Sequence, residues 1–136
     1  RKGMGLPGAI VVAIDANCAA FAAAREQVTG ALHRDLTDIC VPACPDPHIE
    51  QWYLADLEAF RRVVGITPTV PAGKCERGLY KRLLANAVVA AGHSPLLGGI
   101  EFAPDLVAEM NLYRAGRSHT SLKHFITELR AKLRAL

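Results

Sequence analysis

The feature that most constrains the fold is a short apolar run, Ile10 to Ile14, which ends at an acidic residue, Asp15. The run is too short for a free-standing helix and lacks the alternation of a half-exposed strand, so we expect a strand that is buried on both faces. In open α/β sheets, ligands and catalytic groups gather beyond the carboxyl ends of the strands. Asp15 and Asn17 are therefore the first candidate site residues.

The residues that follow predict one parallel strand-helix-strand unit. Residues 18–33 are rich in alanine and carry apolar residues at helical spacing, and residues 38–43 form a second apolar run. A crossover of this kind is right-handed and places the two strands in parallel. Asn17 is suited either to cap this helix or to bind a ligand, and both interpretations stay open.

The rest of the chain predicts further helices separated by breakers. Pro45 and Pro47 hold the backbone in turn geometry, so the next helix begins at His48, and Gly65 is expected to end the helix after it. Arg114–Arg117 is expected to form a basic turn before the last helix. The expected helices cover residues 48–56, 57–64, 75–91, 104–110 and 118–136, with Leu122, Phe125, Ile126, Leu129 and Leu133 as the buried stripe of the last one.

Length and composition indicate a single globular α/β domain over residues 1–136. Hydrophobic residues make up 51% of the chain and charged residues 21%, and the net charge of +3 permits a nucleic-acid partner without requiring one. No apolar run is long enough to span a membrane and no leader pattern is present, so we expect a cytoplasmic protein without membrane contact. The chain begins Arg-Lys-Gly, which is consistent with an N-terminal strand that precedes it.

The four cysteines predict reduced thiols and no metal framework. Cys18, Cys40, Cys44 and Cys75 have no compact paired spacing, and a domain of this size does not need disulfides. Cys40, Cys44 and His48 do not have the spacing of a standard zinc knuckle, and Cys40 is expected in the core. A zinc or redox module that uses Cys40 and Cys44 is a third possible function, after the two given below.

A second group of polar residues lies around the start of the helix at His48, and it includes Asp46, Glu50 and Asp56. Glu50 in the first turn is explained by the helix dipole alone. In a parallel sheet, however, the loop after the second strand lies beside the end of the first, which would bring His48 or Glu50 close to Asp15. They would then supply a metal ligand or a general base, with Mg²⁺ or Mn²⁺ as the cation.

Basic residues form two further groups. Lys81 and Arg82 lie near the start of one helix, and Arg114 and Arg117 precede the last one. Contact with nucleic-acid phosphates and an ordinary solvated surface are both consistent with such groups. The polar cluster before the last helix is explained either by Ser118 or Thr120 as an N-cap or by an anion site at the helix start.

Three sequence segments together resemble a known family. They are IVVAIDAN at residues 10–17, PDPHIEQWYLAD at residues 45–56, and the basic, serine-containing segment that ends in SLKHFITEL at residues 121–129. The combination, over residues 8–134, resembles the Toprim-like proteins of prokaryotic defence and mobile-element loci. It is most similar to the small DUF4276-type proteins, which are related to the nuclease domains of the overcoming-lysogenization-defect family.

The resemblance implies a Toprim-like three-layer sandwich, a mainly parallel central sheet with helices on both faces. It also implies Mg²⁺ or Mn²⁺ held at strand ends for phosphodiester cleavage, with Asp15 as the first acid of the Asp-x-Asp motif. Asn17 stands where the second acid belongs, and residues 1–7 contain no acid that would match the upstream Toprim glutamate. The alternative is an inactive Toprim-like subunit that works with a partner ATPase.

The expected site therefore has Asp15, Asn17 and Glu50 as metal ligands, with Asp15, Glu50 and His48 as catalytic groups. Lys81, Arg82, Arg114 and Arg117 are the candidate nucleic-acid contacts.

Overall fold

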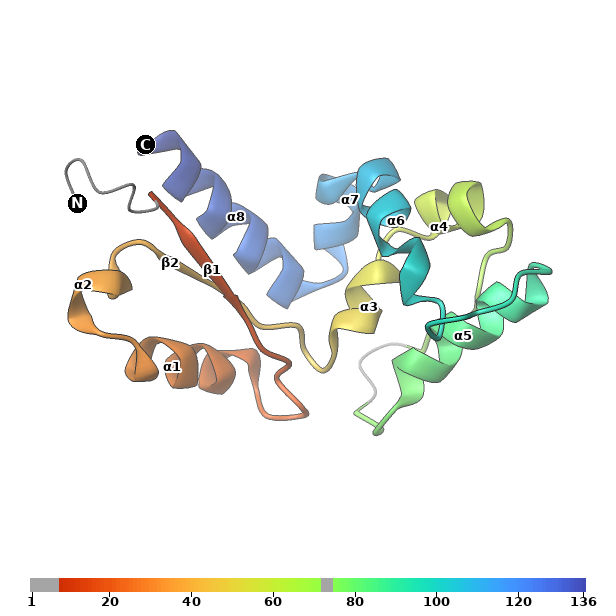
Figure 1. The fold of residues 1–136 in the computed structure, drawn as a ribbon, viewed down its shortest axis with the longest axis horizontal. Helices are drawn as coiled ribbons and strands as arrows, with labels where there is room; N and C mark the ends of the chain where they lie inside the picture. The colour runs from red at the N-terminus through yellow and green to blue at the C-terminus, as the bar shows by residue number, and fades with distance from the viewer. Residues whose placement is uncertain (1–7, 72–74) are drawn as a thin grey trace.

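Two parallel strands, β1 (Ile10–Ala13) and β2 (Cys40–Ala43), form the sheet of this computed structural model, which describes residues 8–71 and 75–136. The strands pair in register from Ile10 opposite Cys40 to Ala13 opposite Ala43. Helix α1 (Phe21–Ala31) and the short α2 (Arg34–Thr37) connect them. The predicted parallel strand-helix-strand unit and the mixed α/β class are thus confirmed, and Figure 1 shows this sheet at one end of the molecule.

The expectation that the first strand is buried on both faces is wrong. In β1, Val12 is partly buried against α1, whereas Val11 is 48% exposed and Ala13 is exposed as well. All four residues of β2 are buried. The reason is position: β2 is covered by β1, by α1 and by the last helix, α8 (Thr120–Arg134), whereas the described chain leaves the odd-numbered face of β1 open.

Helix α1 begins later than the sequence suggests, and Asn17 is not its N-cap. The N-cap is Ala20, which offers no side-chain acceptor, and Asn17 lies in the preceding loop with a φ of 51°. A left-handed backbone is one that asparagine tolerates better than most residues. Asn17 therefore shapes the loop after β1 and does not cap the helix.

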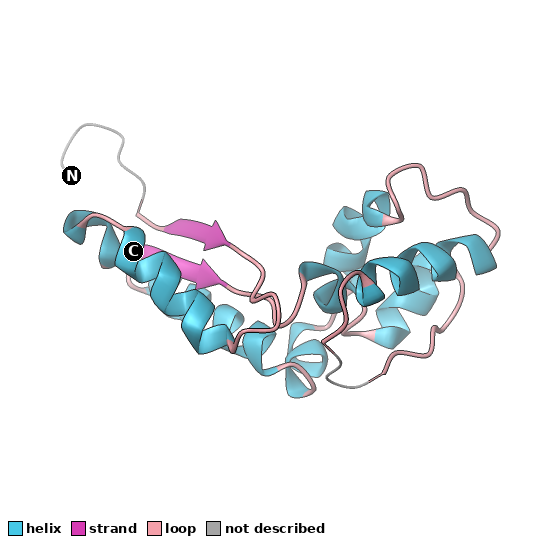
Figure 2. Cartoon of the chain, turned by 90° about the horizontal axis from the view of Figure 1, so that it is seen from below, coloured by secondary structure: helices cyan, strands magenta, loops and turns pink. Residues whose placement is uncertain are grey.

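Helices make up the other end of the molecule, as Figure 2 shows. Large apolar side chains, among them Phe60, Tyr80 and Leu84, form its core and are almost fully buried. Gly65 ends α4 with a φ of 106°, as predicted. The elements are α3 (Ile49–Tyr53), α4 (Leu57–Val64), α5 (Leu79–Ala90), η1 (Ile100–Phe102), α6 (Ala103–Glu109) and α7 (Leu112–Arg117).

The segment before the last helix differs from the prediction in two ways. Arg114 and Arg117 lie in helix α7 and not in a turn. The Asn111 side chain accepts a hydrogen bond from the backbone N–H of Arg114 and caps this helix. The N-cap of α8 is His119, whose side chain makes no capping hydrogen bond, so neither Ser118 nor Thr120 is the cap.

The expected stripe of α8 is only partly buried. Leu122 is buried, the next three members are partly buried, and Leu133 is 55% exposed.

The cysteines divide into two pairs. Cys18 and Cys75 form a disulfide with Cα atoms 5.5 Å apart, which corrects the expectation of four reduced thiols. Cys40 and Cys44 are buried free thiols, as expected for core residues, and burial raises the pKa of both. The spacing of the cysteines did not predict this disulfide, because 57 positions separate Cys18 from Cys75 and only the fold brings them together. None of the described helices has the length and apolar character needed to cross a membrane.

Candidate functional site

The strongest candidate site lies where β1 ends, against the start of α3. Backbone hydrogen bonds continue past the sheet, from Ile14 N–H to the Ala43 carbonyl and from Ala16 N–H to the Pro45 carbonyl. Between them, Asp15 Oδ1 accepts the backbone N–H of Ile49 at 2.9 Å. The carboxylate thus occupies the N-terminus of α3, a position that the helix dipole favours.

The charges around Asp15 define which residues share this site. Burial raises the pKa of Asp15, and the nearby charge of Glu50 raises it further, whereas the Ile49 hydrogen bond and the charge of His48 lower it. Burial also raises the pKa of Tyr53, again with contributions from Glu50 and Asp15. The fold therefore brings Asp15, His48, Glu50 and Tyr53 together at the end of β1, and we call these four residues the strand-end cluster. Tyr53 was not among the site residues that the sequence predicted.

The donor set of this cluster fits a hard cation that takes few protein ligands. The second oxygen of Asp15 and the carboxylate of Glu50 make no hydrogen bond or ion pair with the described residues, and their like charges oppose each other. Mg²⁺ is commonly held by one or two carboxylates together with waters and substrate phosphates. No group of three His, Cys, Asp or Glu residues suited to a metal occurs within residues 8–71 and 75–136.

Asn17, the remaining predicted ligand, lies at the edge of this cluster. Its backbone N–H donates to the Pro47 carbonyl at 3.1 Å, which ties its loop to the segment that leads into His48. Its side chain is exposed and forms no hydrogen bond with the described part of the chain.

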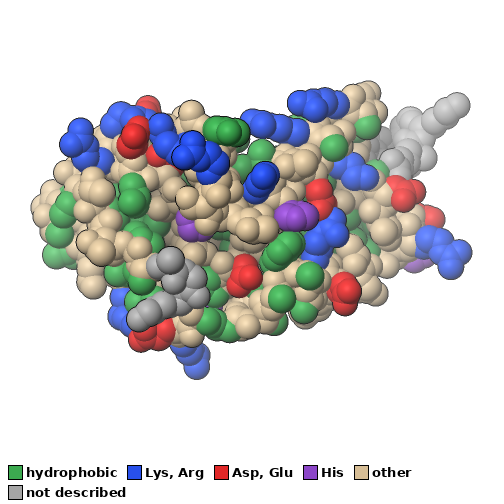
Figure 3. Space-filling view, turned by 180° about the vertical axis from the view of Figure 1, so that it is seen from behind, with side chains coloured by type: hydrophobic (Ala, Val, Ile, Leu, Met, Phe, Trp, Pro, Cys, Tyr) green, Lys and Arg blue, Asp and Glu red, His purple; other side chains and the backbone are tan. Residues whose placement is uncertain are grey.

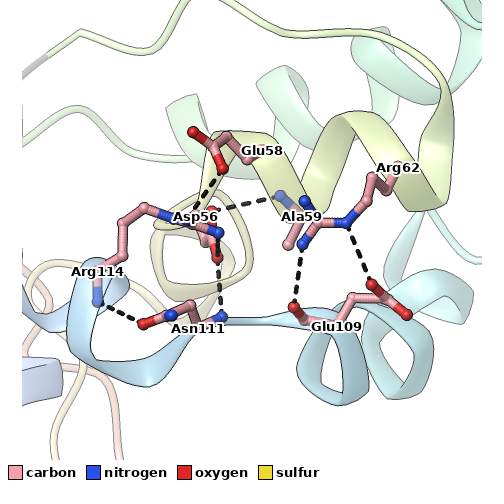
Figure 4. Close-up of polar contacts among 7 residues, drawn as sticks. All are labelled: Asp56, Glu58, Ala59, Arg62, Glu109, Asn111 and Arg114. Atoms are coloured by element: carbon pink, nitrogen blue, oxygen red, sulfur yellow. Dashed lines mark hydrogen bonds and ion pairs between the residues drawn. The ribbon is translucent and has the colours of Figure 1, made fainter.

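Arg114 has a structural role that the sequence did not reveal. It donates to both carboxylate oxygens of Asp56, each at 3.0 Å, and pairs with Glu58 at 2.9 Å, as Figure 4 shows. The fully buried Asp56 carboxylate also accepts the backbone N–H groups of Asn111 and Ala59. This network joins the start of α4 to the start of α7, so the Arg114 guanidinium is already committed to Asp56 and Glu58.

The other three predicted phosphate contacts are on the surface. Lys81 is exposed, while Arg82 pairs with Glu76 at 3.1 Å. Arg117 stacks over the ring of Tyr113, 6.0 Å from its centroid.

Arg117 also belongs to a basic hollow between α7 and α8. Lys123 and Arg130 line the same hollow of about 180 Å³. Their spacing of seven residues on α8 places them on one helix face, a pattern that the sequence contained and that a search for basic helical stripes would find. Figure 3 shows Lys and Arg side chains along the upper edge of one face of the molecule, the edge where Figure 1 places α8, α7 and α4.

Comparison of the chain with protein-family models, with curated proteins and with solved structures finds no match in any of the three.

Proposed function

We propose that this chain is a Toprim-like, metal-dependent hydrolase of nucleic-acid phosphodiesters, with its active site at the end of β1. The observation that carries the proposal is the cluster of Asp15, Glu50 and His48, in which Glu50 lies close enough to raise the pKa of Asp15. Two carboxylates with unpaired oxygens can hold a divalent cation, and a histidine beside them can accept a proton from water.

In this proposal Asp15 and Glu50 would hold Mg²⁺ or Mn²⁺, and Asn17 would contribute its side-chain oxygen. The cation would polarise the scissile phosphate and lower the pKa of water. His48 serves as the proton acceptor for the attacking water or as a contact to the phosphate. The Ile49 hydrogen bond fixes one oxygen of Asp15 and leaves the other for the cation.

Nucleic acid would be held by cationic side chains that bind its phosphates. Arg117, Lys123 and Arg130 supply three positive charges around one hollow, and Lys81 and Arg82 add a second group on α5. Contacts of this kind are independent of base sequence and weaken as salt rises. Arg114 is left out of this set because Asp56 and Glu58 occupy its guanidinium.

The first experiment is a calorimetric titration of Mn²⁺ and Mg²⁺ into the wild-type chain, Asp15→Asn and Glu50→Gln. Asparagine can still accept the Ile49 hydrogen bond, so Asp15→Asn removes the charge and keeps the fold. We expect binding in the wild type and its loss in both variants, with Asp35→Asn as the matched control, since Asp35 is 84% exposed. Nucleic-acid cleavage by the wild type and Asp35→Asn, but not by Asp15→Asn or Glu50→Gln, would support the proposal. Equal metal binding by all four proteins would refute it.

A second function is favoured by an apolar groove of about 410 Å³ between α3, α6, α7 and α8. Its lining includes the exposed side chains of Val107 and Leu133, as well as Tyr53 of the strand-end cluster. In this alternative the chain is an inactive Toprim-like subunit whose groove binds a partner ATPase. Leu133→Asp would then abolish complex formation with a purified ATPase from the same locus, and Asp15→Asn would have no effect.

A further inference from the structure

The apolar groove between α3, α6, α7 and α8 lies next to the basic hollow between α7 and α8. The groove has a volume of about 410 Å³ and the hollow a volume of about 180 Å³. Leu112, Ile126 and Arg130 line both of them. These three side chains therefore form a common border between an apolar space and a positively charged one.

The groove has the lining of a site for hydrocarbon. Its described lining is apolar or aromatic apart from Arg130. Trp52 and Leu122 in this lining are buried, whereas Val107 and Leu133 are more than half exposed, so the groove extends from the core to the surface. Pockets of this volume that are lined mainly by apolar and aromatic side chains are typical of small-molecule sites, in which a few polar groups orient the ligand.

The length and volume of the groove favour a single hydrocarbon chain over a partner helix. Its lining on α8 extends from Leu122 to Leu133. This distance is about three turns of helix, or about 16 Å. A partner helix of the same length, with its side chains, would occupy roughly 1,300 Å³. Most of such a helix would lie outside the groove, whereas an extended alkyl chain along α8 fits within it.

The basic hollow supplies unneutralised positive charge beside the groove. Arg117, Lys123 and Arg130 are exposed and line the hollow. None of the three forms an ion pair with the described part of the chain. The segments 1–7 and 72–74 contain no Asp or Glu that could neutralise them. The three cations repel one another, so an anion bound among them would relieve this repulsion.

We propose that the groove and the hollow together bind one long-chain fatty acid. Its hydrocarbon chain lies along α8, and its carboxylate pairs with Arg130, where the guanidinium can form two parallel hydrogen bonds with it. The inference does not rest on the proposed hydrolase, because Asp15 and Glu50 line neither space. The head group would use cations that the proposed function assigns to nucleic-acid phosphates, so the two ligands would exclude each other.

The test is a calorimetric titration of dodecanoate into the full chain, below the concentration at which dodecanoate forms micelles. We expect a single molecule to bind to each chain, and affinity to rise about tenfold for each two CH₂ groups from octanoate to dodecanoate. Acetate, which has the head group alone, should not bind. Dodecyltrimethylammonium has the same chain and the opposite charge, and it should bind at least about tenfold more weakly.

Two variants at exposed positions test the two parts of the site, each with a control on α8 or just after it. Arg130→Gln should weaken dodecanoate binding about tenfold, whereas Arg134→Gln, outside both linings, should leave it unchanged. Leu133→Asn should weaken binding about fivefold, because a wall of the groove becomes polar. Leu136→Asn is its control, since Leu136 is 75% exposed and lines neither space.

Several outcomes would overturn the proposal. They are the absence of dodecanoate binding, binding of several molecules that the Arg130 and Leu133 variants do not weaken, and equal affinity for the cationic amphiphile. Binding of phosphatidylglycerol vesicles or of an acidic amphipathic peptide in place of dodecanoate would also overturn it, in favour of a lipid surface or a partner helix. Asp15→Asn should bind dodecanoate as the wild type does, so a chain that binds dodecanoate but no metal would refute only the hydrolase.

Discussion

The two ends of the molecule are stabilised by cores of different kinds. The helical end, α4 to α6, buries large side chains, with Phe60, Tyr80 and Val88 fully inaccessible. The sheet end, β1, α1 and β2, buries mainly small residues such as Ala24 and Cys40. Because stabilisation grows with the apolar area removed from water, the helical end carries more of it, and the candidate site lies at the less stabilised end.

Helix α3 connects the two ends although it has only five residues. Leu54, which follows it, belongs to the helical core, whereas Trp52 stacks on Phe125 of α8 with ring centroids 5.6 Å apart. The N–H of Ile49 binds Asp15. Helix α3 thus contacts both ends and the strand-end cluster.

The largest effect is expected from Phe60→Ala, which removes a fully buried ring from the helical core. Substitutions of this kind cost about 3–5 kcal/mol, because transfer free energy is lost and a cavity remains. Urea denaturation followed by Trp52 fluorescence would measure the change. Val89→Ala is the control on the same end, since Val89 is 57% exposed. A cost below about 1 kcal/mol would contradict the assignment of the main core.

The disulfide is a covalent link between the two ends and gives the next largest effect. Cys18 follows β1 and Cys75 precedes α5, so the bond closes a loop across 57 positions. Its removal by Cys18→Ser with Cys75→Ser should lower stability by about 2–4 kcal/mol, mainly through the entropy of the unfolded chain. The double variant should also become insensitive to dithiothreitol. Four titratable thiols in the denatured, unreduced wild type would show that the bond is not formed.

Asp56 tests whether a polar network supplements the helical core. Asp56→Asn keeps the size of the side chain but removes the charge that Arg114 and two backbone N–H groups contact. We expect a loss of about 2–3 kcal/mol at pH 7, because the buried partners lose a charged acceptor. Glu58→Gln is the matched control. Glu58 is 67% exposed, so its pairing with Arg114 should contribute less than about 1 kcal/mol.

The same residue gives a pH dependence with a defined sign. Burial alone would raise the pKa of Asp56, but hydrogen bonds from Arg114, Asn111 and Ala59 lower it below its ordinary value. Its contribution to stability is therefore complete above a pH of about 4 and is lost as the pH falls through the lowered pKa. The stability difference between wild type and Asp56→Asn should shrink as the pH falls below about 4. A difference that stays constant over this range would contradict the lowered pKa.

The sequence predicted most elements because their signals are local. The strand at Ile10 and the helix that ends at Gly65 each depend on a few neighbouring residues. The burial of β1 failed as a prediction because an apolar run does not reveal which faces of a strand other elements cover. The pairing of Cys18 with Cys75 failed because it depends on packing between distant segments.

The site was predictable only as far as topology determines it. Parallel strands place the loop after β2 beside the end of β1, which is why Asp15, His48 and Glu50 meet. The ion pair between Arg114 and Asp56 could not be predicted, because 58 positions separate the two residues and each could equally have been an exposed surface residue.

The smallest effect is expected from Val28→Ala, the counterpart of Phe60→Ala at the sheet end. Val28 is 5% exposed, but it packs among small residues of α1 and β2, so its truncation removes little area and leaves a small cavity. At about 0.8 kcal/mol for each buried CH₂ group, the cost is about 1–2 kcal/mol. Far-UV circular dichroism and Trp52 fluorescence should give the same midpoint for this variant if the two ends unfold together. Separate midpoints would instead show that the sheet end opens first and takes the strand-end cluster apart while the helical core is still folded.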